Sequence, residues 1–148
     1  LAILFGPSLL IWAYGKVMRQ TLSRYTGYYL GFSFAFMFFG MGHFIVTDGM
    51  AMMLPAFVPE KVFLVYLSGI LEFAIAAGIL VSPFRRHATI LAIIVLIGFF
   101  PINVYAALNY VEFGGHAWGP VYLLVRGPLQ LVLIAWGYFL VYRPYRSI

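Results

Sequence analysis

Five apolar runs divide the sequence, and they constrain the fold more than any other feature. They cover about residues 1–17, 28–46, 62–81, 87–108 and 119–142. A hydrocarbon core of about 30 Å requires about 20 helical residues, which the last four runs provide and the first barely reaches. Backbone polar groups in lipid must be satisfied within the segment, and no run alternates like a barrel strand. The sequence therefore predicts an all-α membrane protein: a four-helix transmembrane bundle plus an additional N-terminal hydrophobic helix, in one domain over residues 1–148.

The composition agrees with this class and excludes several functions. Charged residues make up 9% of the chain, against about 25% in a soluble domain. The absence of cysteine excludes disulfides, thiol redox chemistry and thiolate metal sites. No nucleotide-binding loop, nucleophile–base pair or specific metal spacing is present, so we assign no catalytic residue, no metal ligand and no cofactor, and we expect no activity of the chain on its own. A signal peptide is not evident either.

The basic residues lie in short loops, which indicates membrane topology rather than nucleic-acid binding despite the net charge of +5. Lysine and arginine number 3, 1, 2, 0 and 2 in the successive segments that follow the five runs. The positive-inside rule then places the C-terminus in the cytoplasm. The loops from Asp48 to Lys61 and from Glu112 to Trp118 are expected outside. If the first run does not span, the N-terminus is cytoplasmic and the rest is unchanged.

Five strongly polar residues lie inside the last four runs, all at mid-depth or nearer the outer end. They are His43, Glu72, Asn103, Arg126 and Gln130. An arginine in a bilayer is costly, so it must face protein or water and requires a partner. Glu72 is the only carboxylate well inside another run, so we expect an ion pair between Glu72 and Arg126. Such a pair could also be purely structural and fix the helix register.

The helical spacing places these polar side chains on inward faces, together with one tyrosine. Tyr122, Arg126 and Gln130 recur at intervals of four residues and share a face. We expect one cavity that opens outward beneath the loop from Asp48 to Pro59. The predicted ligand-binding residues are His43, Glu72, Asn103, Tyr122, Arg126 and Gln130. For His43 the alternative is a helix-end histidine bonded to a loop carbonyl.

The loop from Thr47 to Lys61 is apolar but too short, and too interrupted by proline, to span. We expect a short interfacial element across the outer mouth of the bundle, with Met50, Met52, Met53 and Phe57 packed downward. The alternative is a soft Cu(I) site formed by Met41, Met50, Met52 and Met53 together with His43. Because the spacing is not specific, packing is the preferred interpretation.

Five short motifs in order resemble the DoxX-like family of small bacterial membrane proteins, over roughly Tyr28 to Tyr142. They are Gly42-His43-Phe44, Leu54-Pro55 with Phe57-Val58-Pro59, Gly69-x-x-Glu72, Pro101-x-Asn103-x-Tyr105, and Arg126-x-Pro128-x-Gln130. The resemblance implies a four-helix bundle in the bacterial plasma (inner) membrane. The family takes its name from a small subunit of a thiosulfate:quinone oxidoreductase, and relatives are linked to oxidative-stress complexes. The resemblance places the recurring polar residues of the family on the five positions selected above.

Two classes of function follow. The first is a membrane protein that binds a small polar or quinone-type ligand in the outer pocket and is associated with a redox or stress-related system. The second is an accessory subunit, structural or for assembly, of a larger membrane complex, with no ligand of its own. The expected partners are the lipid bilayer, other subunits of such a complex, and a quinone or small polar ligand, but not nucleic acid. A transporter is less expected because no inverted repeat is visible.

Overall fold

The structure, a computed structural model, describes residues 24–142. The described part is entirely helical apart from its turns and loops. Its elements are α2 (Arg24–Ile45), α3 (Thr47–Met52), α4 (Lys61–Leu80), α5 (Arg85–Leu108), η1 (His116–Tyr122) and α6 (Leu123–Tyr142). Four segments are long and apolar enough to cross a membrane: α2, α4, α5, and η1 together with α6. The predicted all-α membrane fold is therefore confirmed, and the chain is a multi-pass membrane protein. The additional N-terminal helix predicted over residues 1–17 lies outside the described residues.

The predicted boundaries differ from the observed ones mainly in the last run. The expected helix from residue 119 begins as α6 only at Leu123, because residues 116–122 form the 3₁₀ helix η1. Gly119 interrupts η1 with a left-handed φ of 65°. A Cβ atom at this position would lie 2.4 Å from the ring of Tyr110, so only glycine fits. The turn at Gly119, followed by Pro120, prevents a regular helix across this stretch.

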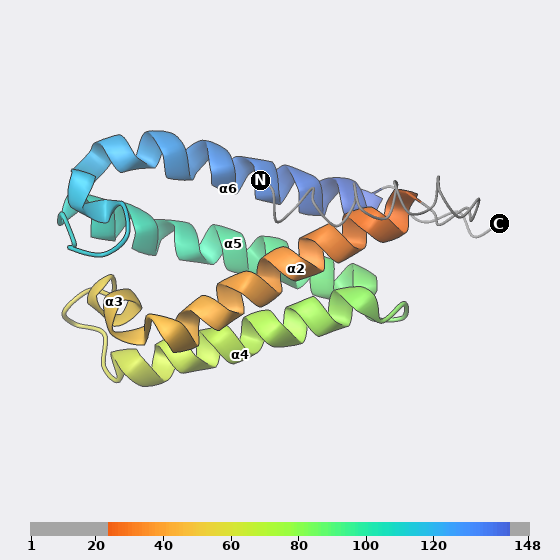
Figure 1. The fold of residues 1–148 in the computed structure, drawn as a ribbon, viewed down its shortest axis with the longest axis horizontal. Helices are drawn as coiled ribbons and strands as arrows, with labels where there is room; N and C mark the ends of the chain where they lie inside the picture. Colours follow the sequence, from red (N-terminus) through yellow and green to blue (C-terminus); the bar gives the residue numbers. More distant parts are fainter. Residues whose placement is uncertain (1–23, 143–148) are drawn as a thin grey trace.

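The four long helices form a bundle whose two ends differ (Figure 1). At one end a tight turn over residues 81–84 joins α4 to α5; we call it the turn end. At the other, the loop end, lie α3 and η1. Helix α2 packs mainly on α4, and α5 packs on both α4 and α6. Helices α2 and α6 touch little, and Figure 1 shows them separating toward the loop end.

A close-packed core fills the bundle from the turn end to its middle. It includes Phe32 and Phe36 from α2, with Ile75 and Ile79 from α4, and all four side chains are buried. Aromatic rings interlock here: Phe32 and Phe36 have centroids 5.3 Å apart, a favourable separation for tilted rings. Such packing holds membrane helices together, because lipid tails provide no hydrophobic drive between them.

Polar groups at the turn end are satisfied by backbone carbonyls or by aromatic faces. Ser33 Oγ donates to the Ala76 carbonyl at 2.8 Å and links α2 to α4. The Tyr29 hydroxyl donates to the Leu140 carbonyl at 2.9 Å and links α2 to α6. The guanidinium of Arg85 lies 4.5 Å from the centroid of the Tyr29 ring and also donates from Nε to the carbonyl of Ile79. These contacts give Ser33, Tyr29 and Arg85 partners within the turn end.

Helices α2 and α4 approach most closely at two glycines. A Cβ atom on Gly69 would lie 2.7 Å from both His43 Cβ and a ring carbon of Phe44, and one on Gly40 would lie 3.1 Å from the Gly69 carbonyl oxygen. Real Cβ atoms essentially never approach as closely as at Gly69, and the approach at Gly40 is tighter than most, so this crossing depends on two residues without side chains. The close approach sets His43 beside Glu72, which lies about one helical turn after Gly69.

Helix α3 covers part of the loop end, where a short element across the mouth of the bundle was predicted. Met50 and Met53 face inward and line the cavity described below. The prediction is wrong for Met52 and Phe57, which are 54% and 85% exposed. Met52 lies in α3, a helix of only six residues whose side chains cannot all face the bundle, and Phe57 lies in the loop after α3, where no helical face directs it inward.

Candidate functional site

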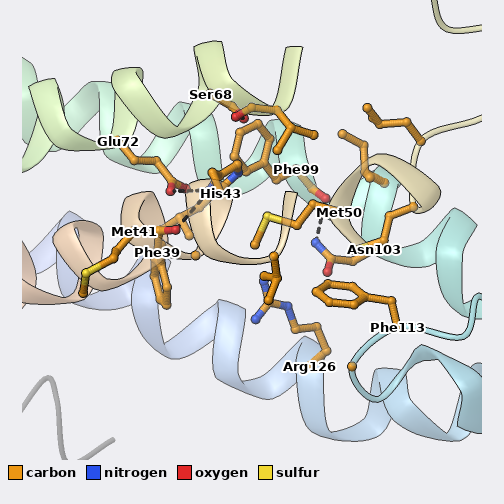
Figure 2. A pocket seen from close by; sticks show the side chains of 18 of the residues that line it. Phe39, Met41, His43, Met50, Ser68, Glu72, Phe99, Asn103, Phe113 and Arg126 are labelled. Atoms are coloured by element: carbon orange, nitrogen blue, oxygen red, sulfur yellow. Dashed lines mark hydrogen bonds and ion pairs between the residues drawn. The ribbon is translucent and has the colours of Figure 1, made fainter. Parts of the chain in front are cut away.

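A cavity of about 780 Å³ lies at the loop end between the helices. This volume is within the range of known small-molecule sites. The structure brings all six predicted site residues into its lining: His43, Glu72, Asn103, Tyr122, Arg126 and Gln130. They come from α2, α4, α5, η1 and α6, and Figure 2 shows several of them around the same space. Most of the remaining lining is apolar, with Phe39, Leu71, Phe99 and Leu133 as examples.

The depth of the polar residues explains why they meet. Antiparallel neighbours bring residues from the same membrane level together, and each residue advances about 1.5 Å along its helix. Glu72, Asn103 and Gln130 are all buried. Polar atoms from different runs therefore face one another within an apolar surrounding. Their joint presence at one cavity is the geometry that the sequence predicted; whether they bind a ligand is taken up below.

The buried carboxylate of Glu72 pairs with a histidine. His43 Nδ1 lies 3.2 Å from Glu72 Oε2, and the two side chains are only 11% and 4% exposed. The same nitrogen lies 3.0 Å from the Phe39 carbonyl oxygen, one turn earlier in α2. The dashed lines in Figure 2 mark both contacts. Nδ1 carries at most one N–H, which the two acceptors share, and a protonated imidazole makes the contact with Glu72 an ion pair as well.

The predicted ion pair between Glu72 and Arg126 is wrong. Among residues 24–142 the carboxylate of Glu72 has its ion-pair contact with His43 alone. The reason is the helix arrangement: α4 packs on α2 through Gly40 and Gly69, whereas α6 packs mainly on α5. The alternative interpretation of His43 is also corrected, since the carbonyl it contacts belongs to its own helix rather than to a loop.

A second histidine reaches the cavity from η1. His116 is buried, with Nδ1 2.9 Å from the Phe113 carbonyl oxygen and Nε2 3.4 Å from Asn103 Oδ1. Asn103 donates from Nδ2 to the Phe99 carbonyl at 2.8 Å, so its oxygen faces the histidine. The Tyr122 ring packs on His116 with centroids 4.6 Å apart. Both ring nitrogens of His116 face oxygen acceptors, so only the imidazolium can donate to both.

Sequence reasoning missed His116 because it treated this residue as an exposed loop position. The residue has no helical periodicity to indicate its direction, and it follows two glycines. The one usable signal was its position just before the last run, where a returning chain must cross the mouth of the bundle.

Ser68, on the same face of α4 as Glu72, also lines the cavity. Its hydroxyl donates to the Val65 carbonyl at 2.8 Å.

The two polar residues of α6 have different environments. Gln130 is buried and donates from Nε2 to the carbonyl of Leu96, which ties α6 to α5. Arg126 extends from α6 into the cavity, beside Phe113 and below Met50 in the view of Figure 2. Its Nε is buried and has no hydrogen-bond partner within the described part of the chain. Arg126 is therefore the cavity residue with an unused buried donor.

Two observations bear on a metal at this site. The described residues contain no group of three His, Cys, Asp or Glu side chains that could hold a metal ion. Of the methionines considered for copper, Met41, Met50 and Met53 line the cavity, whereas Met52 faces away from it. The lining thioethers contribute flexible apolar surface, a role in which methionine adapts to irregular ligands.

Comparison with known proteins identifies a family but no characterised relative. No curated protein and no solved structure matches the chain. One family model matches residues 32–141, a range that contains all six predicted site residues. The chain therefore belongs to the family described as a domain of unknown function, DUF8561.

Proposed function

We propose that this protein is a membrane-embedded ligand-binding protein, whose loop-end cavity holds a small molecule with a polar or quinone-type head. The observation that carries the proposal is the unpaired Nε of Arg126 inside the cavity. An arginine among membrane helices costs several kcal/mol or more unless its donors are used. A ligand head that accepts from this guanidinium would offset that cost.

The distribution of polar groups supports a ligand over a purely internal network. Glu72, Asn103 and Gln130 each contact another element of the protein: His43, His116 and Leu96, respectively. A bundle that needed only fixed register would require one such link and no cavity. Instead, a largely apolar cavity of about 780 Å³ surrounds a few convergent polar atoms, which is the general form of a small-molecule site.

The cellular setting that we propose rests on the sequence. The five motifs resemble DoxX-like proteins, which supports a place in the bacterial plasma membrane, association with a redox or stress-related system, and a quinone among the candidate ligands. The loop charges support a cytoplasmic C-terminus, so that the loop end and its cavity face the outside. A catalytic activity of the chain by itself is not part of this proposal.

A second candidate is a structural or assembly subunit of a larger membrane complex. Specific bonds favour it: Gln130 ties α6 to α5, and Ser33 ties α2 to α4. Polar side chains of this kind can hold membrane helices together without any ligand. Under this reading, Arg126 would bind an acceptor from a partner chain.

Native mass spectrometry of the purified protein distinguishes the two candidates. We expect a bound small molecule in the native protein, and its loss in Arg126→Lys, because lysine retains the charge but not the planar fork. Arg86→Lys is the matched control, since Arg86 is exposed at the turn end, away from the cavity. A stoichiometric protein partner with no small molecule would instead favour the assembly subunit, and an Arg126→Lys protein that kept its small molecule would exclude Arg126 as the binding group.

A further inference from the structure

We propose that the head group held at Arg126 is an anion, a carboxylate or a phosphate carried on an apolar tail, and that this amphipathic acid enters from the lipid. The inference rests on the proposed function and narrows its ligand class. It selects an anionic head over a neutral quinone, and a membrane-dissolved molecule over a water-soluble one.

The charges around the cavity point to an anion. Its lining contains one carboxylate, Glu72, and one arginine, Arg126. The carboxylate contacts His43 from α2 and makes no ion-pair contact with Arg126. A guanidinium cannot lose its proton in a protein. Within the described residues, Arg126 is thus a cation at the cavity wall without an ion-pair partner.

The available hydrogen-bond donors agree with this assignment. Asn103 donates its amide N–H to Phe99, and Gln130 donates to Leu96. Arg126 retains the buried, unused Nε donor. Its planar fork matches the two oxygens of a carboxylate or phosphate and binds them by two parallel bonds. A quinone carbonyl or an alcohol would accept a hydrogen bond but leave the positive charge uncompensated.

The apolar part of the lining accounts for the tail. Phe38, Met41 and Ile45 of α2 line the cavity and are 51%, 48% and 72% exposed, so the cavity opens to the surface along this helix. The cavity wall is therefore continuous with the surface that faces lipid. This continuity occurs on α2, the helix that makes little contact with α6. A tail can lie along these side chains and extend into the bilayer while the head reaches Arg126.

Matched amphiphiles provide the test, with the full-length protein in nanodiscs of a zwitterionic lipid. The probes are palmitate, methyl palmitate, lysophosphatidic acid, decylubiquinone and inorganic phosphate, at a pH at which the carboxyl is ionised. We expect both acids to bind about tenfold or more tightly than the ester and the quinone, since a charge-assisted bidentate pair is lost in the neutral probes. Inorganic phosphate alone should bind more weakly than either amphipathic acid, because it has no tail.

Variants then connect the preference to one residue. Arg126→Met should reduce acid binding about tenfold or more while ester binding stays unchanged, which also demonstrates that the variant is folded. Arg126→Lys should also lose most of the preference, because lysine keeps the charge but lacks the planar fork that makes two parallel bonds. Arg86→Gln, a control that removes a cation at the turn end, should change neither.

Each other outcome has a defined meaning. Equal binding of acid, ester and quinone would overturn the anionic head and leave the proposed function standing. Acid binding that survives Arg126→Met would overturn the role of Arg126, and phosphate binding as tight as the amphipathic acids would overturn the tail. If none of the probes binds, this inference is overturned, and the result counts against the proposed function. Native mass spectrometry tests the proposed function independently, because it detects any bound small molecule.

Discussion

The two ends of the bundle are built from the same helices and differ in how those helices meet. At the turn end, phenylalanine and isoleucine side chains fill the space, and Ser33 and Tyr29 donate to backbone carbonyls. At the loop end the cavity remains, and charged side chains line it. The chain can therefore pack a closed membrane core, so the open loop end is a property of its particular residues rather than a limit of the fold.

The difference also separates two uses of polar groups in a membrane. The polar side chains described at the turn end donate to backbone carbonyls, and the one charge among them, on Arg85, also lies over the Tyr29 ring. At the loop end a carboxylate, two histidines and an arginine surround a space. Stability alone does not favour that arrangement, because buried charged groups rarely add net stability. The cost is understandable if the charges have a task besides holding helices together.

The largest expected effect is a loss of protein stability that differs between substitutions at two phenylalanines, one in the core and one at the cavity. Phe36 is fully buried in the core, so Phe36→Ala should lower the free energy of unfolding by about 3 kcal/mol, the lower part of the range for buried phenylalanine. Phe99 borders the cavity, so Phe99→Ala should cost less than half as much, since part of its ring has no packed neighbour. Reversible unfolding in mixed micelles, followed by circular dichroism, measures both. Equal losses would show that the loop end is as tightly packed as the turn end.

A smaller effect is expected for the coupling between Glu72 and its partners. A double-mutant cycle with Glu72→Gln and His43→Gln should give a coupling free energy of about 1 kcal/mol, because the two side chains touch. The cycle with Glu72→Gln and Arg126→Met should be additive within about 0.5 kcal/mol. Both are measured by the same unfolding assay. A larger coupling in the second cycle would restore the pair between Glu72 and Arg126 that the structure contradicts.

The smallest effect on stability, and a direct test of orientation, comes from single cysteines at the two ends. Glu112→Cys and Arg86→Cys replace exposed residues and should change stability by less than about 0.5 kcal/mol. The chain has no cysteine of its own. An impermeant maleimide applied to intact cells should label residue 112 but not residue 86, and the reverse pattern would invert the topology. His116, in the same loop as Glu112, is unsuitable for labelling because it is buried.

Sequence reasoning reached the helices and the cavity residues because both follow from distance along one axis. The length of an apolar run predicts a span, and counting residues from its end predicts depth, which placed Asn103, Arg126 and Gln130 at neighbouring levels. Contacts around the axis were not predictable in the same way. Glu72 pairs with His43 instead of Arg126 because the order of helices around the bundle is a tertiary property.

Short irregular segments were the other source of error. The directions of Met52, Phe57 and His116 depend on one turn of helix or less, where a periodic pattern has no length over which to develop. Gly119 gave a usable signal beside Pro120, yet the run was taken as helical through it. These errors lie at the loop end, where the helices separate and the connecting segments complete the wall.

The crossing of α2 and α4 at Gly40 and Gly69 has a consequence for how this family can vary. The backbones approach each other there, and the side chains nearest to the two glycines are those of His43, Phe44 and Phe73 rather than the apolar residues that line the cavity. Substitutions among the apolar lining residues, such as Met41, Met50 or Phe99, can then alter the shape and volume of the pocket while the frame stays in place. Members of the family that keep these two glycines could have diverged in ligand by exchanging a few lining residues, with the same scaffold serving each of them.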